Sequence, residues 1–280
     1  MAEKSPTDLG RWVGRRREAY DVVAFGPLRG LAAMLDMPPP PQVPRAAIPP
    51  AWHWLYFLSM SPQAALGEDG AEPRGEFLPP ITLPRRMWAG GSFEFHQPLR
   101  FGERIGRVST IQSIEEKSGK NGPLVFVTMR HEISGETGRA ITEEQVIVFR
   151  SPPSPDQPAI PEPAPIKADW RREIVPDPIL LFRFSALTFN AHRIHYDRPY
   201  ATGTEGYPGL LVHGPLQALL LLELLRGELT RPIRRFEYRA LGPIFDTGPF
   251  TVNGVQDGDE AHVWTADDAG NLGMMGVASL

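Results

Sequence analysis

The chain has 280 residues, of which 41% are hydrophobic and 22% charged, and its formal net charge is -4. This length exceeds one average domain, so we expect two domains or one fused double domain. The slightly acidic balance gives no reason to expect nucleic acid or an anionic membrane as a partner. The absence of cysteine excludes disulfides, thiolate metal sites and a cysteine nucleophile.

The first twenty residues are polar, and their three consecutive arginines are not followed by the apolar core of a secretory signal. The longest apolar run, at residues 216–225, is about ten residues long and too short to span a bilayer. Arginines far outnumber lysines, which favours a bacterial source. We therefore expect a soluble, cytoplasmic bacterial protein.

The N-terminal half begins with a helical pattern and then changes to strands. Asp21 is a candidate N-cap of a helix that extends to about Leu35. Residues 51–58 are hydrophobic nearly all round, which predicts a short buried helix, and residues 67–74 are typical of an exposed loop. Strands are predicted at residues 92–96, 108–114, 124–133 and 141–149.

A proline-rich stretch, residues 151–168, predicts a stiff and extended linker between two units, residues 1–150 and residues 169–280. Beyond it an apolar helix and four strands return, and the strand at Phe236 resembles the strand at Phe93. We infer two copies of one α+β unit, a buried helix followed by about four antiparallel strands. The strands expected in the second copy are residues 236–239, 250–256, 261–265 and 272–280.

The candidate functional residues are concentrated in residues 185–217. This segment contains three of the seven histidines and runs directly into the apolar helix. His195 is the natural acid/base, because an imidazole takes and gives protons near neutral pH. Asn190 cannot act as a base but can orient a water or an imidazole. The alternative is a purely structural role, in which these residues only order a turn or cap a helix.

Gly214 is expected to open the apolar helix. The free N–H groups of its first turn, and the positive end of the helix dipole, would then face a ligand oxygen. Glycine allows a ligand to approach the backbone closely, and Pro215 suits a first helical turn. His213 is expected to order the turn beside Gly214.

A metal site is the alternative for the same segment. His192, His195 and Asp197 are residue types that bind zinc or iron. On a helix the two histidines would share a face, but Asp197 would not face both of them. We therefore expect no metal and no other cofactor.

Two sequence motifs carry a family resemblance. I-H-Y-D at residues 194–197, followed by V-H-G at residues 212–214 and an apolar helix, resembles the MaoC-like (R)-specific enoyl-CoA hydratases. The longer S-A-L-T-F-N-A-H-R-I-H-Y-D, residues 185–197, resembles the branch with fungal mitochondrial hydroxyacyl-thioester dehydratase and bacterial mesaconyl-CoA hydratases. W-A-G-G-S-F-E-F-H-Q-P-L-R-F-G-E, residues 88–103, is similar to the same branch.

The resemblance implies a double hotdog fold, two fused units in which a long helix is wrapped by a curved antiparallel sheet. It also implies a hydratase/dehydratase that interconverts a 3-hydroxyacyl thioester and its trans-2-enoyl form. Acyl-CoA is the expected substrate, acyl-carrier protein the less favoured carrier, and a short dicarboxylic acyl group such as mesaconyl one candidate. The C-terminal unit would be catalytic and the N-terminal unit would shape the acyl pocket.

The family motif Asp-x-Asn-Pro-x-His assigns roles to single residues. His195 matches the catalytic histidine, Asn190 stands where the family has the catalytic aspartate, and His192 stands at the asparagine. Gly214 matches the glycine whose N–H binds the thioester oxygen, and His192 and His213 are further candidates for substrate contact. This chain therefore departs from the family pattern by having an amide at position 190.

Two other functions stay open at this point. The protein could be a hotdog thioesterase, or a non-catalytic acyl-CoA-binding protein, which the amide at position 190 would favour. Arg193 and Arg198 are candidates to bind a second carboxylate of the substrate. The fold is compatible with a monomeric double hotdog or with a homodimer.

Overall fold

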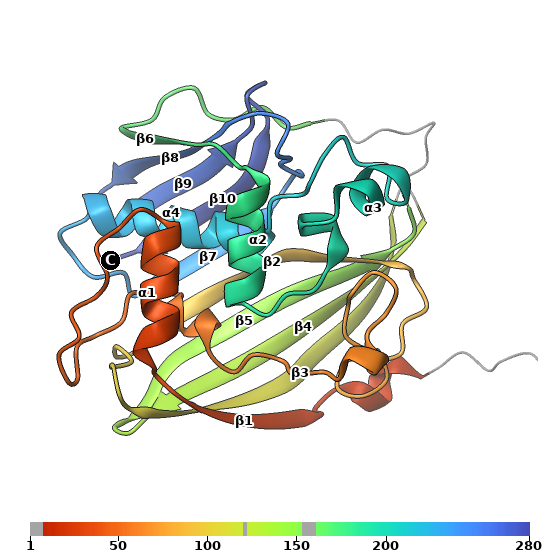
Figure 1. Ribbon diagram of the computed structural model, residues 1–280, viewed down its shortest axis with the longest axis horizontal. Helices are drawn as coiled ribbons and strands as arrows, with labels where there is room; N and C mark the ends of the chain where they lie inside the picture. The colour runs from red at the N-terminus through yellow and green to blue at the C-terminus, as the bar shows by residue number, and fades with distance from the viewer. Residues whose placement is uncertain (1–7, 120–121, 153–160) are drawn as a thin grey trace, which may run out of the picture.

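The computed structural model describes residues 8–119, 122–152 and 161–280. Ten antiparallel strands form one sheet, and the helices lie against one of its faces (Figure 1). The N-terminal half contains β1 (Arg16–Val22), α1 (Phe25–Met34), β2 (Arg85–Phe95), β3 (Arg104–Gly119), β4 (Gly122–Gly135) and β5 (Gly138–Arg150). Its short 3-10 turns are η1 (Leu9–Trp12), η2 (Trp52–Leu55) and η3 (Gln63–Ala65).

The C-terminal half repeats this order of elements. Its helical elements are α2 (Pro178–Leu187), the 3-10 turn η4 (Arg193–His195), α3 (Arg198–Gly203) and α4 (Gly214–Glu228). Its strands are β6 (Trp170–Ile174), β7 (Arg235–Ala240), β8 (Phe250–Asp257), β9 (Glu260–Ala266) and β10 (Leu272–Ser279).

The order of strands in the sheet confirms the internal repeat. It runs β1-β3-β4-β5-β2-β7-β10-β9-β8-β6, so the two halves present the same order from opposite edges. The halves meet where β2 pairs antiparallel with β7, and Phe93 lies opposite Phe236. The two similar strands of the sequence are therefore neighbours at the centre of the sheet. The α+β double hotdog is confirmed.

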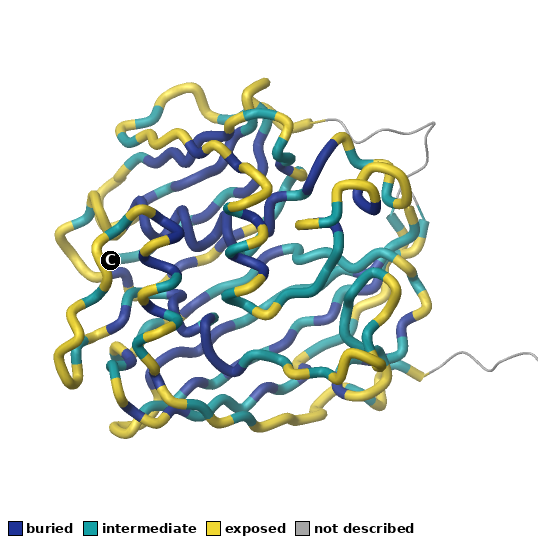
Figure 2. The backbone as a smooth tube through the Cα atoms, in the orientation of Figure 1, coloured by how far each residue is buried: buried dark blue, intermediate teal, exposed yellow. Residues whose placement is uncertain are grey.

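The central helix α4 accounts for much of the core of the C-terminal half. Every residue from Leu216 to Leu225 is buried, and the helix packs on β8, β9 and β10. Apart from Gln217 and Glu223 this stretch is apolar, and such a helix needs an enclosed place. Helices α1 and α2 lie side by side over the sheet (Figure 1), and buried backbone runs through α4 and the strands on which it packs (Figure 2).

The N-terminal half differs from the expectation in two places. Asp21 does not cap a helix, because residues 16–22 pair with β3 as an edge strand; its carboxylate accepts the N–H groups of Val22 and Phe57. Helix α1 begins only at Phe25. The buried helix expected at residues 51–58 is the single turn η2, because Ala51 and Phe57 on either side of it have positive φ values of 64° and 56°.

Every residue between α1 and β2 is described, and the only helical turns there are η2 and η3. The N-terminal half thus has no counterpart of α4. Beneath η2 the sheet instead holds a buried polar cluster centred on Glu143. Its carboxylate lies 2.9 Å from His53 Nε2 and accepts hydrogen bonds from Trp54 Nε1 at 2.8 Å and Gln145 Nε2 at 2.6 Å.

The end of the proline-rich stretch joins the C-terminal half. Ala164 N–H donates to the Gly270 carbonyl, and Leu272 N–H donates to the Glu162 carbonyl, beside the turn between β9 and β10. Residues 153–160 of the expected linker lie outside the described residues. The domain boundaries at residues 150 and 169 stay a prediction. No helix among the described residues is long and apolar enough to cross a membrane.

Candidate active site

The segment between α2 and α4 forms a compact turn that brings the histidines together. Asn190 N–H donates to the Ser185 carbonyl, and His192 N–H donates to Asn190 Oδ1 at 3.0 Å. The turn η4 follows at once and places His195 in the interior, with 6% of its surface exposed. The local fold therefore depends on the Asn190 side chain as an acceptor.

His195 has a defined orientation and tautomer. Its Nδ1 lies 2.8 Å from the carbonyl oxygen of Leu211, which can only accept, so Nδ1 carries the proton. Its ring stacks on the ring of His213, with centroids 3.7 Å apart. Nε2 hydrogen-bonds with no described residue, yet it is not among the buried unpaired atoms of the described chain, so it keeps contact with solvent.

Burial keeps these two histidines neutral. It lowers the pKa of His195 to about 3, against the raising effect of its hydrogen bond to Leu211. Burial also lowers the pKa of His213 well below its ordinary value, and the neighbouring His195 adds to this effect. At neutral pH, His195 Nε2 is therefore a free lone pair, which can accept a proton.

The start of α4 lies beside this pair. His213 is the residue that precedes the helix; it is fully buried, and its Nε2 lies 2.9 Å from Ser185 Oγ of α2. Gly214 begins the helix and Pro215 follows it, so the expected helix start is confirmed. The N–H groups of Gly214 and Leu216 have no acceptor within the helix, as in any first turn. They form an electropositive end next to the neutral imidazole of His195.

Trp88 of β2 forms the opposite wall at Gly214. A methyl group added at Gly214 would lie 3.6 Å from Trp88 Cβ, an ordinary contact. The backbone at this position therefore has room for a methyl group, and Trp88 lies against the start of the helix. Trp54 packs edge-on against Trp88, with ring centroids 5.2 Å apart. Two tryptophans from the N-terminal half thus pack together beside the start of α4 in the C-terminal half.

The loop at residues 67–71 makes a second contact between the halves. Arg193 N–H donates to the Asp69 carbonyl at 2.9 Å, and His192 Nε2 lies 3.9 Å from Asp69 Oδ2. Gly70 has φ +79°, and a Cβ there would lie 1.8 Å from the Ala191 carbonyl oxygen, so only glycine fits. The exposed loop expected at residues 67–74 is in fact docked on the histidine segment.

The structure brings three of the candidate residues together, His192, His195 and His213. The ring of His192 meets His195 edge-on at 5.6 Å, and His195 stacks on His213, so the three histidines form one cluster. Asn190 Oδ1 is occupied by the backbone of the turn, while its amide nitrogen hydrogen-bonds with no described residue.

Three charged residues close to the cluster in sequence, Arg193, Asp197 and Arg198, are already paired. Asp197 faces Arg193 and the Tyr200 N–H, so it does not join the histidines as a metal ligand. In the part of the chain that the structure describes, no three acidic or histidine side chains gather around a cation position. Arg193 is bound to Asp197 and Arg198 to Asp246, so neither arginine is free for a substrate carboxylate.

Sequence reasoning missed Trp88 and Asp69. Trp88 is the first residue of the motif at residues 88–103, but nothing in that motif indicates a contact with Gly214. Asp69 lies in a polar glycine-containing loop, and nothing in its local sequence indicates which surface that loop covers. Both contacts join positions more than a hundred residues apart.

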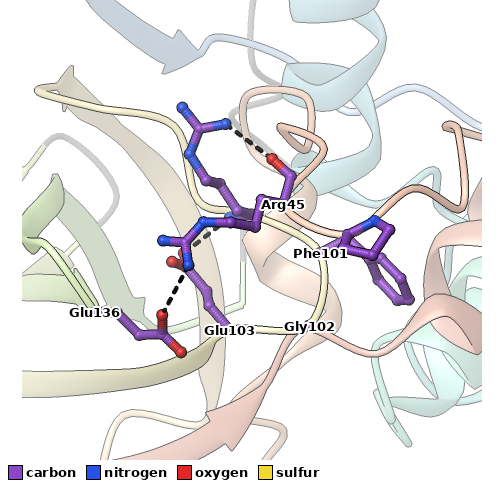
Figure 3. A pocket seen from close by; sticks show the side chains of 7 residues that line it. Arg45, Phe101, Gly102, Glu103 and Glu136 are labelled. Carbon is purple, nitrogen blue, oxygen red and sulfur yellow. Dashed lines mark hydrogen bonds and ion pairs between the residues drawn. The ribbon is translucent and has the colours of Figure 1, made fainter.

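A separate pocket of about 270 Å³ lies at the far end of the N-terminal half (Figure 3). Its polar groups bond one another: Arg100 donates to the Arg45 carbonyl at 2.8 Å, and Arg45 pairs with Glu136 at 3.6 Å. None of the three clustered histidines lines it. This pocket is therefore not the candidate active site. Its lining residues are Pro44, Arg45, Arg100, Phe101, Gly102, Glu103 and Glu136.

The sequence is similar to that of known acyl-thioester hydratases and dehydratases. It is 47% identical over 262 residues to mesaconyl-C(4)-CoA hydratase of Chloroflexus aurantiacus, covering 91% of both chains. It is 30% identical over 234 residues to the mitochondrial hydroxyacyl-thioester dehydratase type 2 of Schizosaccharomyces pombe, covering 74% of this chain and 77% of the relative.

Solved structures agree on the fold. HtdX of Mycobacterium tuberculosis superimposes with a TM-score of 0.67 at 15% identity, covering 95% of this chain and all of that one. A MaoC-like dehydratase gives the same TM-score and identity, with 97% and 99% coverage. Residues 51–246 match the family of hydroxyacyl-thioester dehydratase type 2, and this range includes β2, the histidine cluster and α4. The chain therefore belongs to the hydroxyacyl-thioester dehydratase type 2 family.

Proposed function

We propose that this protein is a hydro-lyase that adds water to a trans-2-enoyl thioester and removes it from the 3-hydroxyacyl thioester, with CoA as the thiol carrier. Its family and its similarity to a named hydratase and a named dehydratase support this activity. The single structural observation behind it is the neutral His195, whose Nε2 lone pair lies beside the free N-terminus of α4.

The reaction needs a place for negative charge and a carrier for one proton. The thioester oxygen would accept hydrogen bonds from the N–H groups at Gly214, where the helix dipole also favours negative charge. His195 Nε2 takes a proton from water as the oxygen bonds to C3, and the electrons of the double bond move towards the thioester oxygen. His195 then returns the proton to C2. These reaction steps balance with one water molecule and the transfer of one proton, so the proposal includes no metal and no redox cofactor.

Asn190 would position the water. Its carbonyl oxygen is held by the His192 N–H, so its amide nitrogen is the group that would donate to the water. A donor can hold the oxygen of a water molecule while His195 takes the proton. Asn190 thus contributes orientation, and His195 carries the proton. His213 would keep His195 in place by stacking.

The proposed substrate is a short acyl-CoA. Trp88 and Trp54 form a solid aromatic wall close to Gly214, which favours a small acyl group over a long chain. The mesaconyl group named for the relative at 47% identity is the first candidate. We propose that residues 169–280 carry the proton-transfer groups and residues 1–150 shape the acyl pocket. A monomer or homodimer and a cytoplasmic location remain predictions.

One assay distinguishes the three functions considered. Mesaconyl-CoA and crotonyl-CoA are followed at the absorbance of the enoyl thioester, while free thiol is measured in parallel. Loss of the enoyl signal without thiol release supports the hydratase. Thiol release identifies a thioesterase. Binding of acyl-CoA in calorimetry without either change identifies a non-catalytic binding protein.

The variant His195→Ala tests the assignment of the proton carrier. We expect turnover to fall at least about 1,000-fold, because the variant removes the imidazole nitrogen that takes the proton from water. His262→Ala, at an exposed site on β9, is the matched control and should keep full activity. Circular dichroism and binding of butyryl-CoA check that the fold and the site survive. Retention of near-wild-type turnover by His195→Ala would show that another group carries the proton.

A further inference from the structure

A histidine that carries a proton through a reaction must hold a positive charge for part of it. His195 is buried, and burial makes that charge costly. A carboxylate close by would offset this cost, but Asn190 is a neutral amide. Among the described residues no carboxylate hydrogen-bonds with His195, and its one hydrogen bond goes to the Leu211 carbonyl.

A carboxylate does reach the histidine cluster, from the other half of the molecule. Asp69 Oδ2 lies 3.9 Å from His192 Nε2, and the ring of His192 meets the ring of His195 edge-on at 5.6 Å. The side chains of His192 and Asp69 are only 15% and 30% exposed. The field of the Asp69 carboxylate at the histidines is therefore less screened by solvent than it would be at the surface.

The position of Asp69 is fixed by several contacts. Its Oδ1 accepts the Ala71 N–H at 2.9 Å, and its backbone carbonyl accepts the Arg193 N–H at 2.9 Å. Arg193 Nη1 also donates to the Glu68 carbonyl at 3.2 Å, and Gly70 packs directly against Ala191. The loop is thus locked onto the residues on either side of His192. Such locking is expected when one side chain has to keep a fixed place in another unit's site.

We infer that Asp69 supplies, across the junction between the two halves, the negative charge of the proton-transfer site, and that it acts through His192. The inference rests on the proposed function. Asp69 keeps the proton of His192 on Nε2 and stabilises positive charge on the histidine pair. His195 takes the proton from water as hydroxide adds to C3 and returns it to C2, and Asp69 offsets the positive charge that this step creates. Asp69 is a positioning residue, and the N-terminal half is more than a wall of the acyl pocket.

The charged groups around His192 define what a pH measurement should show. Asp69 comes from the docked loop, Arg86 from β2 and His195 from η4. Burial lowers the pKa of His192 to about 4; Asp69 opposes this effect and Arg86 adds to it. Removing the charge of Asp69 must therefore lower the pKa of His192 further.

Asp69→Asn is the decisive variant, because the oxygen of the new amide can still accept the Ala71 N–H and the backbone contact to Arg193 is kept. We expect kcat to fall about 10- to 100-fold with little change in KM, and the acidic limb of kcat/KM to move to lower pH. Glu68→Gln removes the same charge from an exposed side chain of the same loop and should change neither. In a protein that already carries His192→Gln, adding Asp69→Asn should lower kcat less than about twofold further, because the residue through which Asp69 acts is no longer present.

The histidine signals of the protein, followed by NMR during a pH titration, test the coupling without any turnover. The pKa of His192 should fall in Asp69→Asn and stay unchanged in Glu68→Gln. An inactive wild-type protein with this NMR shift would refute the proposed function and leave the coupling intact. Equal behaviour of the two variants would overturn the inference. So would a loss of kcat in Asp69→Asn with an unchanged pH profile, because that result indicates a purely structural role.

Discussion

Replacing Glu143 by leucine should destabilise the protein by about 4 kcal/mol. Glu143 is 2% exposed and lies at the centre of the polar cluster beneath η2, where its carboxylate bonds the side chains of His53, Trp54 and Gln145. These interactions hold its pKa at about 2 in spite of burial, so it is ionised at neutral pH. The cluster occupies the face of the sheet on which a counterpart of α4 would pack.

The magnitude follows from the three donors that leucine would leave behind. A buried donor without a partner costs about 1–3 kcal/mol, and leucine would leave three of them. Trp54 and Gln145 are only half-buried and can regain some hydration, which places the expected total at about 4 kcal/mol. Glu143→Gln should cost less, about 1–2 kcal/mol. Its amide oxygen can still accept from Trp54 and Gln145, and His53 can change tautomer because its Nδ1 is unpaired.

Urea unfolding followed by tryptophan fluorescence measures these changes, with an unaltered m-value as the sign of an intact two-state transition. Glu144→Gln is the control, since this neighbour is 33% exposed and pairs with Arg130 at 3.5 Å on the surface. It should cost less than about 1 kcal/mol. The double variant His53→Leu/Glu143→Leu should cost less than the two single variants together. A Glu143→Leu protein within about 1 kcal/mol of wild type would refute the role given to this cluster.

Two further predictions concern the site and its histidines. Gly214→Ala should leave the free energy of unfolding within about 1 kcal/mol of wild type, because the added methyl group meets Trp88 at an ordinary distance. The value of kcat/KM should fall at least about tenfold, because the methyl group enters the space of the thioester. Kinetics and urea unfolding of the same sample test this, and a fall in stability that matches the fall in activity would contradict it. Acid should destabilise the fold. In the folded protein the pKa values of His131, His192 and His195 are lowered to about 4, 4 and 3. The unfolded chain therefore binds protons at these residues first, as the pH drops below about 6.5. Each should cost about 1 kcal/mol between pH 7 and pH 5.5, and a urea midpoint that stays constant over this range would contradict the burial of these rings.

Much of the architecture is encoded in local sequence. Alternation of apolar residues located the long strands, because a strand with one covered face needs a period of two. The apolar run at residues 216–225 identified α4, since a helix apolar on all sides must be enclosed. Gly214 and Pro215 marked its start for reasons that lie within one helical turn. Two neighbouring motifs also sufficed to identify the histidine segment.

The sequence misled where long-range pairing decides the local structure. Asp21 and Val22 fit the start of a helix in isolation, but they end an edge strand that pairs with β3, and Asp21 bonds Phe57 rather than capping a helix. The aromatic residues 51–58 are apolar enough for a buried helix, yet positive φ values at Ala51 and Phe57 restrict them to one turn. Local propensity is a weak term, and tertiary contacts override it at such places.

The sequence by itself determined the repeated unit, the central helix and the identity of the histidines, because these depend on periodicity and on residues close together in the chain. Only the tertiary structure decided what surrounds them. The β2–β7 pairing places Trp88 in front of Gly214, and the docked loop brings Asp69 to His192 from a distant part of the sequence. The pKa of His195 is likewise a property of burial, which no neighbouring residue in the chain can set.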